Sequence, residues 1–206
     1  MMKLIPNITR TLLLLVDVQN DFCPGGALAV LDGDAVIEPL NALSAALAAA
    51  GGRVAASQDW HPRGHCSFGP SDQGLWPEHC VQGEWGAAFH DKLDLKPVSL
   101  IVRKGFRQGL DSYSAFFEND RSTSTGLEGG IKQMNIETVI IGGLATDYCV
   151  FYSAMDSRRL GFNTIVVEDA VRGVNCPEGS VEKALAEMRA NGILFAASAQ
   201  LLQEIH

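Results

Sequence analysis

The sequence has few cysteines and no excess of positive charge, and each shortage excludes a class of protein. Five cysteines in 206 residues are an odd number without framework spacing, which excludes a disulfide-stapled secreted domain. We therefore expect free thiols and a cytoplasmic location. The 16 basic residues against 24 acidic ones give a net charge of −8, which argues against nucleic-acid and anionic-membrane partners. A small-molecule partner is expected instead.

Long apolar runs are also missing. The run Leu12–Val16 ends on an acidic residue and lacks a small-residue cleavage site, so no signal peptide is predicted. No run approaches the ~18 apolar residues that a membrane span requires. With 47% hydrophobic residues, the chain is neither disordered nor a low-complexity repeat. Its length favours a single domain, residues 1–206, and leaves the oligomeric state open.

Short apolar runs alternate with helix-like segments along the chain. The expected strands are residues 11–18, 53–59, 98–103, 138–141, 163–168 and 193–196. The expected helices are residues 34–50, 146–160, 178–190 and the segment from 198 onwards. This alternation predicts an α/β fold, a doubly wound parallel sheet. Two stretches, 60–92 and 105–126, break the pattern, and loops of this length are usually functional.

Four chemically capable side chains are expected at one edge of this sheet. Asp17, Asp59 and Lys104 stand at the ends of the first three strands, and Cys149 follows the fourth. Ligands of open parallel sheets bind outside the carboxyl ends of the strands. The sequence therefore predicts that a binding or catalytic site lies at this edge.

A carboxylate and three histidines gather around the first long loop: Asp59, His61, His65 and His79. Asp59 and His61 are two residues apart, so in extended chain they face the same side. One carboxylate with three imidazoles suits Zn²⁺, Fe²⁺ or Mn²⁺. Cys66 and Cys80 each follow a proposed histidine and are alternative ligands. Neighbouring residues of an extended chain point to opposite sides, which favours packing roles for both thiols.

The segment Gly142–Val150 (GGLATDYCV) has the pattern of a nucleophile on a strand-to-helix turn. Its two glycines allow a tight backbone path, and Asp147 is expected to cap the helix. Cys149 would then lie in the first turn, where exposed amides lower a thiol pKa and hold an oxyanion. The histidines are assigned to the metal, so Asp17 is the candidate base and Lys104 the group that stabilises the thiolate.

Five motifs in fixed order resemble a known family: VDVQNDFCPGGAL, QDWHPRGHCSF, LWPEHC, KG…DSYSAF and GLATDYCV. Between about Leu12 and Ala170 the chain is similar to the nicotinamidase/pyrazinamidase group of the isochorismatase-like hydrolases. The resemblance implies a six-stranded parallel sheet with helices on both faces, a Rossmann-like three-layer sandwich. It also implies hydrolysis of nicotinamide to nicotinate and ammonia in NAD salvage, with pyrazinamide as a further substrate.

The resemblance gives nine side chains a role: Asp17, Lys104 and Cys149 as the catalytic triad; Asp59, His61, His65 and His79 as metal ligands; Phe22 and Trp76 as the walls around the pyridine ring. The amides of Ala145 and Cys149 would form the oxyanion hole, with a non-proline cis peptide before Ala145. The reaction would pass through a thioester on Cys149. The metal, zinc with iron or manganese as alternatives, would bind the ring nitrogen and orient the substrate.

Four other functions stay open at this stage. The chain resembles amidases that act on other carboxamides or carbamoyl groups, although these relatives generally lack the full metal set. It also resembles isochorismatases, which usually lack the cysteine present here as Cys149. A metal-hydroxide hydrolase with a structural Cys149, and a non-catalytic sensor of metal or nicotinamide, are the alternatives from other classes. Preference between nicotinamide and pyrazinamide, and the roles of Cys66, Cys80 and Cys176, are not assigned.

Overall fold

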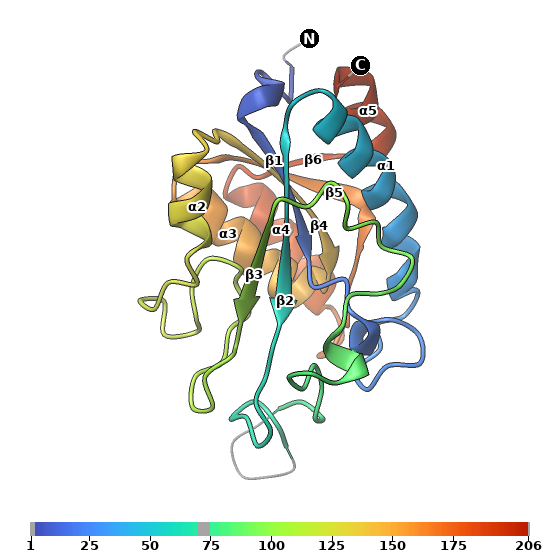
Figure 1. The fold of residues 1–206 in the computed structure, drawn as a ribbon, viewed down its shortest axis with the longest axis vertical. Coiled ribbons are helices and arrows are strands. Elements are labelled where there is room, and N and C mark those ends of the chain that lie inside the picture. Colours follow the sequence, from blue (N-terminus) through green and yellow to red (C-terminus); the bar gives the residue numbers. More distant parts are fainter. Residues whose placement is uncertain (1–2, 70–74, 206) are drawn as a thin grey trace.

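A six-stranded parallel sheet forms the centre of the computed structural model, which describes residues 3–69 and 75–205 (Figure 1). Its order is β3-β2-β1-β4-β5-β6. The strands are β1 (Thr11–Val16), β2 (Arg53–Asp59), β3 (Leu100–Lys104), β4 (Thr138–Leu144), β5 (Asn163–Arg172) and β6 (Leu194–Ala196). All neighbouring strands run parallel, and Leu12 of β1 lies opposite both Arg53 and Val139. The predicted parallel sheet is confirmed.

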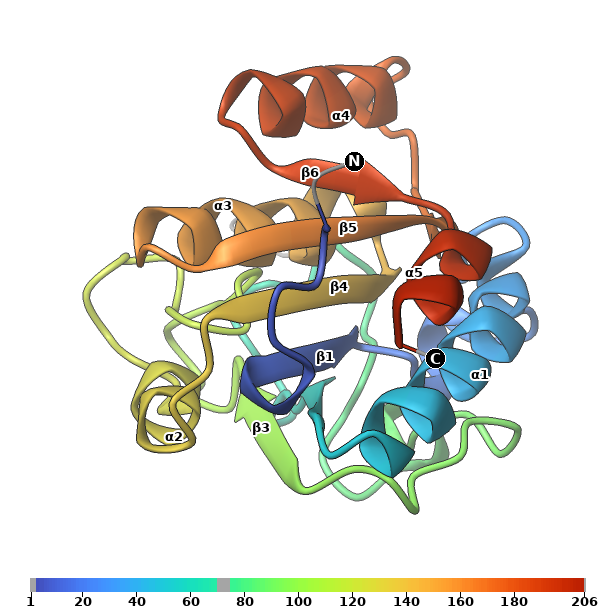
Figure 2. The same cartoon turned by 90° about the horizontal axis from the view of Figure 1, so that it is seen from above.

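Helices cover both faces of this sheet (Figures 1 and 2). They are α1 (Ile37–Ala49), α2 (Leu127–Gln133), α3 (Phe151–Arg159), α4 (Ser180–Ala190) and α5 (Ser198–Ile205). Side chains of β1 alternate between the two faces. Leu13 and Leu15 pack in a core with α1 and α5, whereas Leu12 and Leu14 pack in a second core with α2, α3 and α4. The sheet is buried on both sides, which explains the continuous apolar run of β1.

Several predicted strand ends differ from the structure: β1 ends at Val16 rather than at 18, β3 covers Leu100–Lys104 rather than 98–103, and β5 continues to Arg172 rather than ending at 168. Two further differences concern β4 and α2. The fourth strand does not end at Ile141, because β4 continues to Leu144 and includes both glycines. A Cβ atom at Gly143 would lie 2.1 Å from the carbonyl oxygen of Val16, so this glycine allows close approach of β1 rather than a turn. The second difference is α2, which the sequence analysis did not predict.

The strands β3, β2, β1 and β4 are neighbours and run parallel, so their carboxyl ends lie side by side at one edge of the sheet. The order reverses between β1 and β4, which makes this edge the topological switch point where open sheets bind ligands. In the described ranges no helix is long and apolar enough to cross a membrane. All five cysteines lie in these ranges, and each is a free thiol.

Candidate active site

Lys104 lies at the centre of a buried cluster of charged side chains at this edge. Its Nζ atom is 2.9 Å from Asp17 Oδ2 and 2.5 Å from Asp59 Oδ1. Nζ also donates a hydrogen bond to the Ser112 carbonyl at 3.0 Å and lies 3.4 Å from Cys149 Sγ. Lys104 and Asp17 are both 0% exposed. The structure thus brings together the three residues predicted as a triad, from the ends of three strands.

Burial and neighbouring charges shift the pKa of each group in this cluster. Burial raises the pKa of Asp17, and Lys104 reduces this shift without cancelling it. Burial lowers the pKa of Lys104, but Asp17 and Asp59 outweigh it and hold that pKa well above its usual value. Burial raises the pKa of the Cys149 thiol; Lys104 opposes this, and the two carboxylates raise it further. The predicted lowering of this thiol pKa is wrong: the pKa is raised, which favours the protonated thiol over the thiolate and calls for a base near Cys149.

Asp17 is placed to act as that base. It follows β1 in a left-handed backbone conformation with φ 47°. Its Oδ1 atom accepts a hydrogen bond from Ser57 Oγ at 2.7 Å, which fixes the carboxylate. Its Oδ2 atom is paired with Lys104 but accepts no well-oriented hydrogen bond within the described chain. One oxygen each of Asp17 and Asp59 lies within 4.8 Å of Cys149 Sγ, so the Asp17 carboxylate is close enough to take the thiol proton.

Cys149 lies on a wide helical turn, Thr146–Val150, that leads from β4 into α3. The peptide bond Leu144–Ala145 before this turn is cis, as the family resemblance implied. The expected helix cap by Asp147 is wrong, because its side chain turns away from the amides of this helix. Its oxygens accept hydrogen bonds from distant residues instead: the amides of Val174 and Asn175 and the hydroxyl of Ser180. Asp147 therefore fastens the segment before α4 to the turn that carries the nucleophile.

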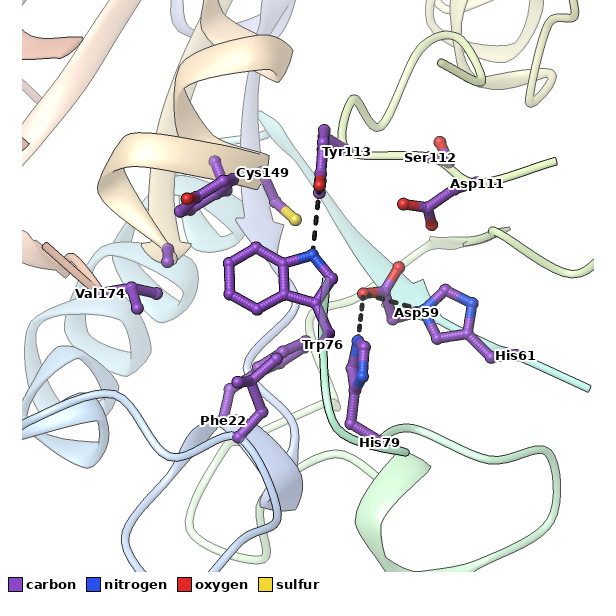
Figure 3. A pocket seen from close by; sticks show the side chains of 13 residues that line it. Phe22, Asp59, His61, Trp76, His79, Asp111, Ser112, Tyr113, Cys149 and Val174 are labelled. Atoms are coloured by element: carbon purple, nitrogen blue, oxygen red, sulfur yellow. Dashed lines mark hydrogen bonds and ion pairs between the residues drawn. The ribbon is translucent and has the colours of Figure 1, made fainter. Parts of the chain in front are cut away.

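Asp59, His61 and His79 place ligand atoms within 4.8 Å of one another. Asp59 Oδ2 is 3.5 Å from His61 Nε2 and 3.9 Å from His79 Nε2 (Figure 3). The Nδ1 atom of His61 donates to the Gly105 carbonyl, and that of His79 to the Pro77 carbonyl, each at 2.8 Å. Each ring therefore presents its Nε2 lone pair to Asp59, as metal-binding histidines do. This buried donor set fits a divalent ion such as zinc.

His65 lies beside these three residues. Its ring stacks on that of His61 with centroids 4.1 Å apart. Among the described residues, a ring nitrogen of His65 lies within 4.8 Å of ligand atoms of His61 and Asp111. The described residues form no such group of His65 with Asp59 and His79. Its Nδ1 atom is 2.7 Å from Ser67 Oγ, and its Nε2 atom is 3.3 Å from the Leu110 carbonyl. The predicted fourth ligand is therefore adjacent to the cluster, with Nε2 facing a carbonyl oxygen.

Phe22 and Trp76 line the same cavity as Cys149 (Figure 3). The Phe22 ring lies 5.6 Å from the His79 ring, measured between centroids. Trp76 Nε1 donates a hydrogen bond to the Tyr113 hydroxyl at 3.1 Å, which holds the indole over the cavity. Both aromatic residues are thus placed to contact a flat ring between Cys149 and the histidines.

Sequence reasoning missed several residues of the cavity wall: Leu28, Asp111, Ser112, Tyr113, Tyr148 and Val174. Tyr148 packs edge-on against Trp76, with ring centroids 4.9 Å apart. Tyr113 stands in the DSYSAF motif and Tyr148 directly precedes Cys149, so motif proximity was an available signal for both. Leu28 and Val174 carry no chemistry that a motif search would detect.

Comparisons with known proteins agree with this geometry. The family model described as Isochorismatase domain matches residues 11–200. The nicotinamidase of Acinetobacter baylyi is 42% identical over 205 residues, which cover 92% of this chain and 94% of that protein. The crystal structure of an L. infantum protein in complex with nicotinate has a TM-score of 0.88 and 38% identity, covering 94% of this chain and 96% of that one.

A third relative carries a metal. The structure of Pyrococcus horikoshii pyrazinamidase in complex with zinc superimposes with a TM-score of 0.83 at 35% identity. The match covers 91% of this chain and 99% of that chain. The chain thus resembles proteins described with zinc and with nicotinate along nearly its whole length.

Proposed function

We propose that this chain, which belongs to the isochorismatase family, is an amidohydrolase that converts nicotinamide to nicotinate and ammonia. The observation that carries the proposal is the buried contact of Asp17, Lys104 and Cys149 beside an aromatic-lined cavity. The 42% identity to a nicotinamidase supports the substrate. Pyrazinamide is expected to react in the same way, because it also carries a carboxamide on a flat nitrogen ring.

The reaction begins with proton transfer from Cys149 to Asp17. Sγ attacks the carboxamide carbon, and the C=O π electrons move to oxygen, where the amides of Ala145 and Cys149 would hold the oxyanion. Asp17 then gives its proton to the departing nitrogen; the C–N bond breaks and ammonia leaves. A thioester between Sγ and the nicotinoyl group remains, and Lys104 keeps Asp17 in place throughout.

The second half of the reaction uses the same base. Asp17 takes a proton from water, whose oxygen attacks the thioester carbon. The C–S bond breaks, nicotinic acid leaves and loses its proton to the solvent as nicotinate, and the proton on Asp17 returns to the Cys149 thiolate. The raised pKa values of Asp17 and of the thiol suit this cycle, because they favour the protonated form of each group and the cycle passes one proton between them.

One divalent metal ion, zinc with iron or manganese as alternatives, would be held by Asp59, His61 and His79, with His65 as the fourth protein ligand. When bound, the ion would supply a Lewis acid for the ring nitrogen of the substrate. Phe22 and Trp76 would hold the ring on its two faces. The nucleophile in this arrangement comes from the protein.

We further propose that residues 1–206 form one domain that acts on a small molecule in the cytoplasm, within NAD salvage. One sheet joins strands from Thr11 to Ala196, which supports the single domain. Five free thiols fit a reducing compartment. An oligomer, and a preference for nicotinamide over pyrazinamide, are separate questions for solution measurements.

The test is ammonia and nicotinate formation from nicotinamide by metal-loaded wild-type protein and by Cys149→Ala. Cys176→Ala is the matched control, because it removes an exposed thiol by the same substitution. We expect activity in the wild type and the control, and none in Cys149→Ala. Turnover that survives in Cys149→Ala would show that Cys149 is not the nucleophile and would favour a metal-hydroxide mechanism. Inactivity of the wild type would refute the proposed substrate.

A further inference from the structure

Glu118 is a buried carboxylate that neither the triad nor the metal ligands include. It lies on the loop between β3 and α2 and is 1% exposed. Its Oε2 atom accepts a hydrogen bond from the Gly105 amide at 3.4 Å, and its Oε1 atom accepts one from Arg107 at 2.9 Å. Burial raises the pKa of this carboxyl, and the Gly105 amide and Arg107 oppose that shift. A buried acid needs such partners, and these two fix its position.

Gly105, the residue that Glu118 holds, also contacts a proposed metal ligand. Its carbonyl oxygen accepts the hydrogen bond from His61 Nδ1 at 2.8 Å. Its backbone is left-handed with φ +60°, and a Cβ atom here would lie 2.4 Å from His61 Cε1. The backbone of Gly105 is therefore packed directly against the imidazole, and any displacement of this backbone changes the orientation of the ring.

The middle of the same loop reaches the triad. The Ser112 carbonyl accepts a hydrogen bond from Lys104 Nζ at 3.0 Å. Ser112 Oγ lies within hydrogen-bond distance of the Ser114 and Phe117 carbonyls, at 3.0 and 3.2 Å. Residues 105–118 thus present one carbonyl to the metal cluster and one to the triad, and the side chain of Glu118 bonds back to the start of this segment at Gly105 and Arg107.

We propose that Glu118 is a positioning residue for the metal centre: it holds the Gly105 backbone, whose carbonyl orients His61 toward the ion. The inference rests on the proposed function, because His61 is a metal ligand there. Groups bonded directly to a metal ligand typically change metal affinity by about 10- to 100-fold when they are mutated. Glu118 acts through one such group, the Gly105 carbonyl, so we expect a loss at the lower end of this range from Glu118→Gln, which places an amide where Gly105 N–H and Arg107 require an acceptor.

The experiment measures zinc affinity of metal-stripped protein by competition with a chromophoric chelator. Glu137→Gln is the matched control: it makes the same substitution at an exposed glutamate that also pairs with an arginine, Arg10. We expect Glu118→Gln to bind zinc at least about tenfold more weakly than wild type and Glu137→Gln to match wild type. A Co²⁺-loaded sample should also show an altered visible spectrum in Glu118→Gln alone, because the ligand geometry changes.

A second variant covers the case in which Glu118→Gln does not fold. Glu118→Asp keeps the charge for Arg107 but is one methylene shorter, so it withdraws from the Gly105 amide and should also weaken zinc binding. Zinc affinity equal to wild type in the folded variants, or an equal loss in Glu137→Gln, would overturn the proposal. Zinc affinity is read without substrate, so failure of nicotinamide turnover in the wild type would refute the function and leave this result interpretable.

Discussion

Replacing Lys104 by methionine removes the ammonium group that is paired with both Asp17 and Asp59. The two carboxylates lie within 2.9 Å and 2.5 Å of Nζ, and neither is more than 4% exposed. The methionine side chain is unbranched like that of lysine and one atom shorter, so the substitution deletes the ammonium group and keeps most of the packing of the stem. Breaking a buried pair by removing one partner costs about 3–5 kcal/mol. We expect Lys104→Met to lower the free energy of unfolding by this amount near pH 7.

The loss should shrink in acid. Asp17 already has a raised pKa because of burial, and Lys104 is the main group that lowers it. Without Lys104 the folded-state pKa of Asp17 rises further above its unfolded value of about 3.9. A carboxyl group whose pKa is higher in the folded than in the unfolded state destabilises the fold when it is ionised. The destabilisation is complete above the folded-state pKa and absent below the unfolded-state pKa. The difference between Lys104→Met and wild type is therefore smaller at about pH 5 than near pH 7.

The assay is urea denaturation of both proteins after metal removal, at the two pH values. Removing the metal isolates the ion pairs from the charge of a bound cation. Typical domains unfold with about 5–15 kcal/mol, so a variant that loses about 3–5 kcal/mol still gives a measurable transition. A loss below about 1 kcal/mol near pH 7, or a loss that does not shrink in acid, would refute the reasoning.

Three further predictions concern the base, the metal and the ring pocket. Ser57→Ala removes the hydrogen bond that lowers the pKa of Asp17, so the acidic limb of the pH–kcat profile should move to higher pH; an unmoved limb would exclude Asp17 as the base. Gly105→Ala should empty the metal site, because its Cβ would collide with His61 at 2.4 Å; full metal content by elemental analysis would contradict this. Trp76→Leu should raise KM by about 2- to 12-fold with little change in kcat, since aromatic contacts contribute about 0.5–1.5 kcal/mol. An unchanged KM would remove Trp76 from the ring contact.

Most strands of the sheet could be predicted because the apolar pattern that indicates a buried strand lies within the strand itself. The run Leu12–Val16 is apolar throughout, and a strand buried on both faces requires that. The catalytic edge followed from the same pattern, because Asp17, Asp59 and Lys104 end or follow strands that proved to be neighbours. Knowing where the strands stop was enough to place the three charges near one another.

The features of the fold and the site that could not be predicted from the sequence depend on contacts between residues far apart in the chain. Helix α2 has the sequence LEGGIKQ, whose two glycines disfavour a helix, and it forms because Leu127 and Ile131 are buried against the sheet. Asp147 precedes a helix as a cap would, but its partners come from residues 174–180. The thiol pKa of Cys149 depends on burial and on charges from three other strands, which no local pattern encodes.

The most direct test of the account is whether nicotinamide hydrolysis passes through a thioester on Cys149. Hydroxylamine added during turnover would compete with water for this intermediate and divert product from nicotinate to nicotinohydroxamate. We expect the hydroxamate fraction to rise with hydroxylamine concentration while ammonia release continues, and Cys149→Ala to form neither nicotinate nor nicotinohydroxamate. Nicotinate as the single product at all hydroxylamine concentrations, with ammonia release retained in Cys149→Ala, would contradict this expectation.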